Sequence, residues 1–490
     1  MLAVCCDGNR KHYRFKKSRG TEEPSLYEGL FIAKDDEVLA FQENIRGSSG
    51  ARANDNGTCG VSRFRASKEA SKKSSSKIDE EGIQVAVCRH GILLRGLNHY
   101  RGEIFAYPMF LQKELGERAN VTFFCMDVVC RYWPYLSKVV DEFPDLQPLM
   151  HMRPFLSVMH AKAHTAKCEV KWSGAHQQGA GSTLGEEVEQ CNAFLSRIAV
   201  TTKHMSKAGR TDMLTVMAMR WNQKKFHNLA STLSRRYQKA TTTLESQLNR
   251  MAAMKMELGI TDDQLESWIV DVNEWAEATT SPHDADVGAV ATRIEELVAS
   301  IKWRTQRLYK DNDGCKGRAR IRRKIREEKK NLNSVVESYN KMVPNDILTV
   351  DSILSDDFIW PWQLPQGNSV DLRIKRKAFV VVMAARRLEE EKGVLVAEMV
   401  KHWNYLRNRA DSLRERSSQL CRETATDMWG LSKAGIEGLQ AITRRRQEET
   451  NREIKHAKNC YIEVLSGTGA EMNFEDSDSE YHSDSDTEAE

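Results

Sequence analysis

A chain of 490 residues is long enough to form two or three domains, each with its own hydrophobic core. Its 73 lysines and arginines nearly balance its 69 aspartates and glutamates, so the net charge of +4 does not by itself identify a partner. No apolar stretch reaches the roughly 20 residues that a membrane helix needs, and no secretory signal opens the chain. These features predict a soluble, intracellular protein with no membrane partner. The 11 scattered cysteines indicate reduced thiols rather than a disulfide framework.

The first part of the chain alternates short apolar runs with polar and glycine-rich breaks, which is typical of an α/β fold. The pattern predicts a helix at 104–117 and strands at 2–6, 27–32, 83–89, 92–97 and 121–129. The polar stretch 46–81 is rich in Ser, Lys and Gly, and we interpret it as an insertion or surface loop. Because a strand follows Met1 almost at once, we expect the chain to be a fragment of a longer polypeptide, which would remove any upstream Cys-rich DNA-binding module.

The rest of the chain has helical periodicity, which begins where Val188, Cys191 and Leu195 mark one face of a helix. Further helices are predicted at 211–257, 262–277, 286–309, 317–342, 370–418 and 430–457. Such long charged helices favour an extended bundle or a coiled coil, although no strict heptad runs through the region. The organisation predicts an α/β domain at 1–230, a helical domain at 231–465 and a disordered acidic tail at 466–490.

Three acidic positions stand out against their surroundings. Asp127 interrupts an almost continuous apolar strand, where an isolated carboxylate costs several kcal/mol unless it is paired, metal-bound or neutralised. Asp7 ends another apolar strand, and Glu186 or Glu189 opens the helix after a glycine-rich connection. Carboxylates from separate strands and a helix are what two-metal phosphoryl transfer on DNA requires, with Mg²⁺ or Mn²⁺ as the ions. The alternative is that Asp7, followed by Gly and Asn, belongs to an ordinary turn.

The two glutamates differ in their local sequence. Thr183 and Glu186 have the S/T-x-x-E spacing of a capping box, which gives Glu186 a structural role at the start of the helix. Glu189 has no such role, so we favour it as the metal ligand. Glu186 remains the first alternative and Glu187 the second.

Four segments carry a family resemblance: CCDGNRKHYRF (5–15), VCRHGILLRGLNHYRGEIFAYPMF (87–110), FFCMDVVCRYWPYL (123–136) and the block that begins MHAKAH (159–197). In order and spacing they resemble the characteristic blocks of Kyakuja-Dileera-Zisupton (KDZ) transposases. The resemblance covers roughly residues 1–230 and weakens beyond them. It implies a ribonuclease-H-like core whose DDE triad, Asp7, Asp127 and Glu189, acts in DNA cleavage and strand transfer.

The sequence departs from the family pattern beside the triad. Gln190 follows Glu189 where the family usually has an arginine, and Arg10 follows Asn9 where an aromatic or aliphatic residue is expected after the Asn. Two functions therefore stay open. The first is a metal-dependent transposase that acts on transposon ends in the nucleus and assembles with further copies of itself. The second is a decayed or host-adopted DNA-binding or chromatin-interaction protein on the same fold.

A second group of residues has metal-ligand chemistry. His160, His164 and Cys168 are spaced by four residues, and Cys88 and His90 lie upstream. Zn²⁺ binds such nitrogen and sulfur ligands tetrahedrally, so one hypothesis is a zinc site made by Cys88, His90, His164 and Cys168. In the alternative, the histidines line the active site or satisfy hydrogen bonds in the core. Cys125, Cys130 and Cys191 are interpreted as small core residues.

Basic residues cluster in the segment RARIRRKIREEKK (318–330). As DNA-backbone contacts we predict Arg318, Arg320, Arg322, Arg323, Lys324 and Arg326. A solvated helix face or a nuclear-import signal is the alternative interpretation of the same cluster.

Overall fold

The structure is a computed structural model that describes residues 2–17, 23–46, 77–100, 102, 104–162, 164–278, 285–310, 315–344, 347–355, 358, 360–361, 372–422 and 425–466. Most of the predicted insertion at 46–81 and nearly all of the predicted tail at 466–490 lie outside these residues. The chain divides into two compact units. The first contains Met1–Phe226 and Thr243–Glu391, and the second contains His227–Thr242 and Lys392–Glu490. The sheet and the helical residues up to 391 therefore belong mostly to one unit.

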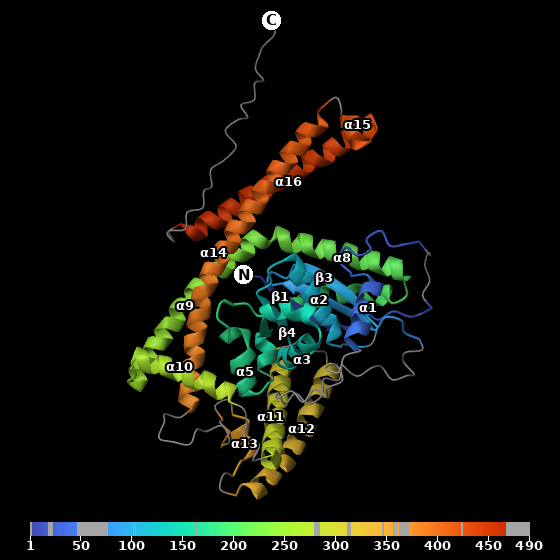
Figure 1. Ribbon diagram of the computed structural model, residues 1–490. Helices are drawn as coiled ribbons and strands as arrows, with labels where there is room; N and C mark the ends of the chain where they lie inside the picture. The colour runs from blue at the N-terminus through green and yellow to red at the C-terminus, as the bar shows by residue number, and fades with distance from the viewer. Residues whose placement is uncertain are drawn as a thin grey trace. The chain divides into compact units, whose positions relative to one another are not determined.

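The centre of the first unit is a mixed five-stranded sheet (Figure 1). Its strands are β1 (Ala3–Asn9), β2 (Gly82–Cys88), β3 (Leu93–His99), β4 (Phe123–Met126) and β5 (Arg153–Leu156). Their order in space is β3-β2-β1-β4-β5. The pairs β1–β2 and β2–β3 are antiparallel, whereas β4 runs parallel to both β1 and β5. The fold is therefore an α/β sheet followed by a large helical region, as the composition of the two halves predicts.

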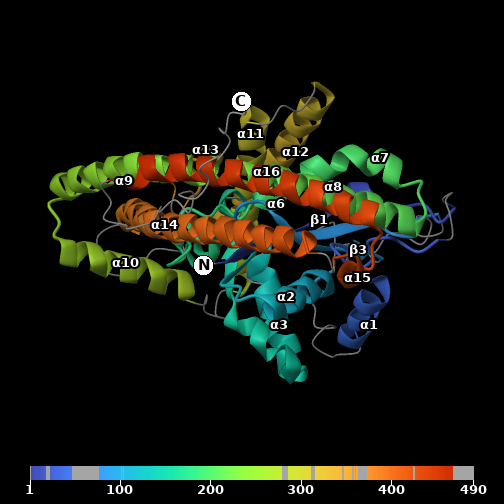
Figure 2. The same ribbon diagram turned by 90° about the horizontal axis from the view of Figure 1, so that it is seen from above.

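Both faces of the sheet are covered, because the strands are apolar on both sides. Alternate residues point to opposite faces of a strand, so Val4 and Cys6 enter one core while Ala3 and Cys5 enter the other. The first core is closed by α1 (Asp35–Arg46), α2 (Ala106–Arg118) and α3 (Val129–Glu142). The second is closed by α6 (Glu187–Leu195) and α8 (Lys207–His227). Figure 2 shows these two groups of helices on opposite sides of the strands.

The remaining helical segments range from single turns to a helix of 49 residues. The α-helices are α4 (Val158–Ala161), α5 (Ala166–Trp172), α7 (Ala199–Thr202), α9 (Leu229–Leu258), α10 (Asp262–Glu277), α11 (Ala285–Lys310), α12 (Cys315–Met342), α13 (Val350–Ile353), α14 (Leu372–Leu420), α15 (Ala425–Trp429) and α16 (Lys433–Leu465). The 3₁₀ segments are η1 (Arg10–His12), η4 (Pro144–His151), η5 (Gly174–His176) and η6 (Ser196–Ile198). None of the helices in the described part of the chain is both long enough and apolar enough to cross a bilayer.

The helices of each unit have contacts of their own, for example apolar ones in the first unit and polar ones in the second. In the first unit, α11 and α12 lie side by side and share a core that includes Ile294, Leu297 and Leu332 (Figure 1). In the second unit, His402 Nδ1 lies 2.6 Å from the Tyr461 hydroxyl and Arg409 pairs with Glu453 at 3.0 Å. These contacts join the part of α14 beyond residue 391 to α16 within that unit.

Most predicted elements are confirmed, and the differences have local causes. The predicted strand at 27–32 is wrong: these residues form turns, and only Ile32 makes an isolated bridge, to Gly96. The predicted strand 121–129 is shorter, because the chain turns at Asp127 and α3 begins at Val129. The predicted helix 211–257 is two helices, α8 and α9. The sequence patterns did not predict α1, α3 or β5.

Candidate active site

The first carboxylate of the site, Asp127, lies at the end of a strand. Asp127 follows β4 directly and begins the turn into α3, where a parallel strand in an α/β sheet usually presents functional groups. Its side chain is 30% exposed, so it is neither sealed in the core nor fully hydrated. The Ser157 hydroxyl donates a hydrogen bond to Asp127 Oδ1, and His160 Nδ1 lies 3.1 Å from the same oxygen. The partners of Asp127 thus come from the end of β5 and from α4, beside the end of its own strand.

Asp127 and His160 each stabilise the charged form of the other side chain. Burial raises the pKa of Asp127, but His160 and the Ser157 hydroxyl outweigh burial and hold that pKa below its ordinary value. Burial likewise lowers the pKa of His160, but the carboxylates of Asp127, Glu189 and Glu186 outweigh it and raise that pKa to about 9. At neutral pH, the pair is therefore a carboxylate beside an imidazolium.

The second carboxylate comes from α6. Ligand atoms of Asp127, His160 and Glu189 all lie within 4.8 Å of one another, although the three residues belong to separate segments of the chain. Neighbouring glutamates have other partners. Glu186 accepts a hydrogen bond from the Met159 backbone N–H, and Glu187 accepts one from Cys5 Sγ at 3.1 Å. Of the glutamates at the start of α6, Glu189 is therefore the one grouped with Asp127.

The predicted capping box at the start of α6 is wrong. Glu186 is itself the N-cap residue of the helix and makes no side-chain capping bond, so its pairing with Thr183 does not form. Instead, Gly185 has a φ of +81°, which places the chain in the left-handed region just before the helix. Burial raises the pKa of Glu186, an effect that the Met159 N–H opposes.

The third carboxylate, Asp7, lies on the same face of the sheet. Cys5 of β1 is opposite Cys125 of β4 in the last pair of the parallel register. Asp7 lies two residues farther along β1, and Asp127 directly follows the end of β4. Asp7 pairs with Val85 of β2, which packs with Cys5 in the core beneath α6, so Asp7 is on that face of the sheet. Asn192 on α6 donates a hydrogen bond of 3.0 Å to Asp7 Oδ2. Among the described residues, Asp7 is nevertheless outside the group formed by Asp127, His160 and Glu189.

The glycine-rich connection before α6 is held by acidic side chains of α14. Glu390 accepts a hydrogen bond of 2.8 Å from the Gly179 N–H, and Glu391 accepts one of 2.9 Å from the Ser182 N–H. Glu391 also forms a buried ion pair with Arg89, in which Arg89 Nη2 lies 2.7 and 2.8 Å from the two carboxylate oxygens. All of these residues belong to the first compact unit. The contacts fix the segment that leads into the glutamate-bearing helix.

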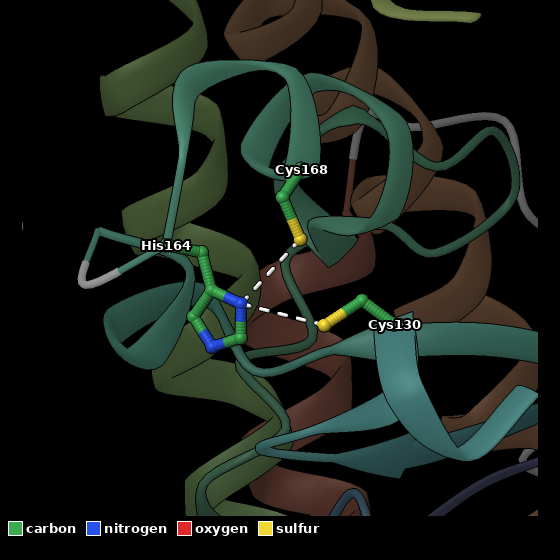
Figure 3. Close-up of side chains that lie close together, drawn as sticks. All are labelled: Cys130, His164 and Cys168. Carbon is green, nitrogen blue, oxygen red and sulfur yellow. Dashed lines mark hydrogen bonds between the residues drawn. The ribbon is translucent and has the colours of Figure 1, made fainter. Parts of the chain in front are cut away.

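A second group of ligand atoms lies close to Asp127 in the sequence. His164 Nδ1 is 3.5 Å from Cys130 Sγ and 3.4 Å from Cys168 Sγ (Figure 3). The structure thus brings His164 and Cys168 together with Cys130, and not with Cys88 and His90 as the sequence interpretation had it. Cys88 ends β2, and its Sγ lies 3.8 Å from His90 Nδ1. Within the described residues, that pair does not join the group around His164.

The predicted DNA-binding residues lie along α12. The side chains of all six residues are described, and all six lie in the first half of α12: Arg318, Arg320, Arg322, Arg323, Lys324 and Arg326. Arg323 and Lys324 pair with Glu327 at 3.8 and 3.3 Å. The side chains of Arg323 and Lys324 are 71% and 43% exposed, so these ion pairs lie at the surface. The cluster therefore belongs to a solvent-facing surface on a helix of the first unit.

Some site residues carry too little signal to be assigned from the sequence. The sequence indicates His160 only as a lining residue, although its spacing from His164 marks it as part of a functional segment. Ser157 and Asn192 are common polar residues whose roles depend on long-range contacts to Asp127 and Asp7. Cys130 follows an apolar run, which favours its interpretation as a core residue.

Comparison with known proteins gives one match. No curated protein and no solved structure matched the chain. The family model described as Kyakuja-Dileera-Zisupton transposase matches residues 1–222, a segment that contains all five strands, α6 and every candidate carboxylate. Over residues 1–222 of its 490, the chain is therefore similar to the KDZ transposases.

Proposed function

We propose that this chain is a DDE-type transposase that cleaves DNA and transfers strands, with Asp7, Asp127 and Glu189 as the ligands of two divalent metal ions. The observation that carries the proposal is the meeting of Asp127 and Glu189, from the end of β4 and from α6, within 4.8 Å of each other. Asp7 is hydrogen-bonded by Asn192 of α6, the helix that carries Glu189, and this supports its inclusion. Two carboxylates this close repel each other, and divalent cations bound between them would remove that repulsion.

We further propose that the sheet is ribonuclease-H-like. An antiparallel β1-β2-β3 unit followed by β4 and β5 parallel to β1 is the arrangement expected of that fold. The positions of the carboxylates, in the first strand, after the fourth strand and on a later helix, are also those expected of a DDE triad. Both features support the assignment.

The donor atoms suit the metal ions that such chemistry uses. Mg²⁺ and Mn²⁺ prefer oxygen ligands, and Asp7, Asp127 and Glu189 offer carboxylate oxygens at the partly open surface of the sheet. Two bound ions would neutralise charge on the reacting phosphate and stabilise the attacking and leaving oxygens. The chain's own contribution is to position the ligands: Ser157 holds Asp127, and Asn192 holds Asp7.

His160 adds a positive charge to this acidic site. With its pKa raised to about 9, the imidazole is protonated at neutral pH and lies against Asp127. A cation there reduces the repulsion between the carboxylates before DNA is bound. It also offers a hydrogen-bond donor where negative charge develops on a phosphate.

The basic face of α12 supplies a surface for the DNA backbone. Arg318, Arg322 and Arg326 are spaced by four residues, so they form one stripe along the helix. Arginine contacts to phosphate supply affinity that does not depend on base sequence.

Nicking of supercoiled plasmid DNA in the presence of Mn²⁺ or Mg²⁺ tests the proposed reaction. We expect Asp127→Asn and Glu189→Gln to lose more than about 100-fold in rate, since loss of a residue that merely supports a metal ligand already costs about 10–100-fold. Asp145→Asn is the matched control, because Asp145 is an exposed aspartate of η4. If the wild type and Asp127→Asn were equally inert with Mn²⁺, the non-catalytic DNA-binding alternative would replace this proposal.

A further inference from the structure

We propose that Cys130, His164 and Cys168 bind one zinc ion that cross-links the segments carrying Asp127 and His160. The three residues come from different elements: Cys130 from the first turn of α3, His164 from the loop after α4, and Cys168 from α5. Figure 3 shows both sulfur atoms directed at the same ring nitrogen, His164 Nδ1. This site differs from the proposed magnesium site in position and in donor atoms.

The spacing of the donor atoms fits a shared metal ion. Zn–S bonds of about 2.3 Å and a Zn–N bond of about 2.1 Å at a tetrahedral angle separate sulfur from nitrogen by about 3.6 Å. The observed separations are 3.5 Å for Cys130 and 3.4 Å for Cys168. Little movement of any side chain would be needed to admit the ion.

Ordinary hydrogen bonding accounts less well for the same geometry. An imidazole nitrogen has either one lone pair or one N–H, so Nδ1 makes one good hydrogen bond in either tautomer. Here two thiols approach it at nearly equal distance. A zinc ion between the three atoms would bind both sulfurs as thiolates, release their protons and satisfy the nitrogen at once.

The surroundings of the three residues also suit a zinc ion. Cys130 is 4% exposed and Cys168 is 6% exposed, and both belong to the core that covers the first face of the sheet. Thiolates are well matched to Zn²⁺, and neither cysteine is in a disulfide. Three protein ligands leave the fourth tetrahedral position for water or another ligand.

The ion would hold two parts of the active site in place. Cys130 lies three residues after Asp127, and His164 lies four residues after His160. A zinc ion bound by both Cys130 and His164 therefore connects the segment 127–130 to the segment 160–164. At the other ends of these segments, Asp127 and His160 contact each other at 3.1 Å. The proposal does not rest on phosphoryl transfer, because zinc content is measured without DNA or magnesium.

Elemental analysis of the full chain, purified without chelator, is the direct test. We expect one zinc ion per chain in the wild type and its loss in Cys130→Ser and His164→Ala. Cys88→Ser is the matched control: it removes a buried thiol that also faces a histidine, and it should keep the zinc. Zinc retained in Cys130→Ser, or lost in Cys88→Ser, would overturn the assignment of ligands.

A second measurement tests the proposal even if the Cys130 and His164 variants fail to fold. Co²⁺ added to the metal-free wild type should produce thiolate-to-cobalt absorption, and His164→Cys should restore metal binding with stronger thiolate absorption than the wild type. Neither measurement depends on nuclease activity, so the zinc proposal can be tested even if the nuclease proposal fails. A wild type that contains no zinc and gives no thiolate–cobalt absorption would end the proposal, as would a Cys130–Cys168 disulfide in the purified chain.

Discussion

Ser157 is one of the two side chains that contact Asp127 Oδ1 among the described residues. It is fully buried just after β5, and its hydroxyl donates to the same Asp127 oxygen that His160 approaches. A hydrogen bond of this kind fixes the direction in which a carboxylate presents its lone pairs to a metal. The hydroxyl also helps to keep the pKa of Asp127 below its ordinary value, against the effect of burial.

We predict that Ser157→Ala weakens Mn²⁺ binding by about 10–100-fold, the usual cost of losing a residue that orients a metal ligand. Titration calorimetry with Mn²⁺ measures this affinity without a DNA substrate. Ser173→Ala is the control, since Ser173 is a buried serine that bridges to β5 through its backbone. Equal losses in the two variants would show that packing, and not the hydrogen bond to Asp127, is responsible.

A further residue, Gln190, stands where the KDZ pattern usually has an arginine. The resemblance leads one to expect an arginine after the catalytic glutamate, and Gln190 cannot supply its charge. In the structure, Lys225 of α8 donates a hydrogen bond of 3.0 Å to Gln190 Oε1. A positive charge is thus present beside α6, although it comes from another helix.

At the scale of elements, the glycine-rich connection and α14 act together. The connection needs glycine at Gly181, whose φ is +56° and where a Cβ atom would lie 2.4 Å from Glu391 Oε2. Glu391 in turn pairs with Arg89, and both side chains are at most 2% exposed. The segment that leads into α6 is therefore fixed by a residue 209 positions after Ser182 in the chain.

We predict that Glu391→Ala lowers the free energy of unfolding of the first unit by about 3–5 kcal/mol, because it leaves the Arg89 charge buried without its carboxylate. Chemical unfolding followed by tryptophan fluorescence measures the change, and limited proteolysis should detect an opened glycine-rich connection. Glu389, two residues earlier on α14, supplies the control Glu389→Ala. An Arg89→Met, Glu391→Leu double variant should recover much of the stability. If it is no more stable than Glu391→Ala alone, the ion pair is not the cause.

The basic stripe of α12 gives a second prediction for an element. Replacing Arg318, Arg322 and Arg326 by Gln should weaken DNA binding for every sequence and reduce the slope of log K against log salt by about 1 for each phosphate that is no longer bound. Fluorescence anisotropy at several salt concentrations measures both effects. The control replaces three exposed arginines of α14 in the second unit: Arg407, Arg414 and Arg416. An equal change of slope in the control would indicate that overall charge, and not this stripe, binds DNA.

For the whole molecule, the sequence predicted elements better than their assembly. Helices with strong amphipathic patterns, such as 262–277, were predicted with the bounds that the structure has. Asp7 and Asp127 could be singled out because charge in an apolar strand is costly. The strand at 27–32 was wrong, since apolar residues in turns resemble a short strand when their partners are unknown.

What could not be predicted depends on contacts between distant residues. Nothing local to Cys130 indicates that it faces His164 and Cys168, because α3 and α5 approach each other only in the folded unit. The same is true of the division into units. Residues 243–391 have the same helical periodicity as the rest of the helical half, yet they belong to the unit that contains the sheet.

The central claim is that Asp7, Asp127 and Glu189 meet at one site that binds two divalent metal ions. Cleavage of the polypeptide by Fe²⁺ with ascorbate and peroxide tests it most directly, because the iron replaces Mg²⁺ and cuts the backbone only nearby. We predict cuts close to residues 7, 127 and 189 in the same preparation, all suppressed by excess Mg²⁺ and all lost in Asp127→Asn. Cuts near one of these residues without the other two, or cuts that Mg²⁺ does not suppress, would contradict the account.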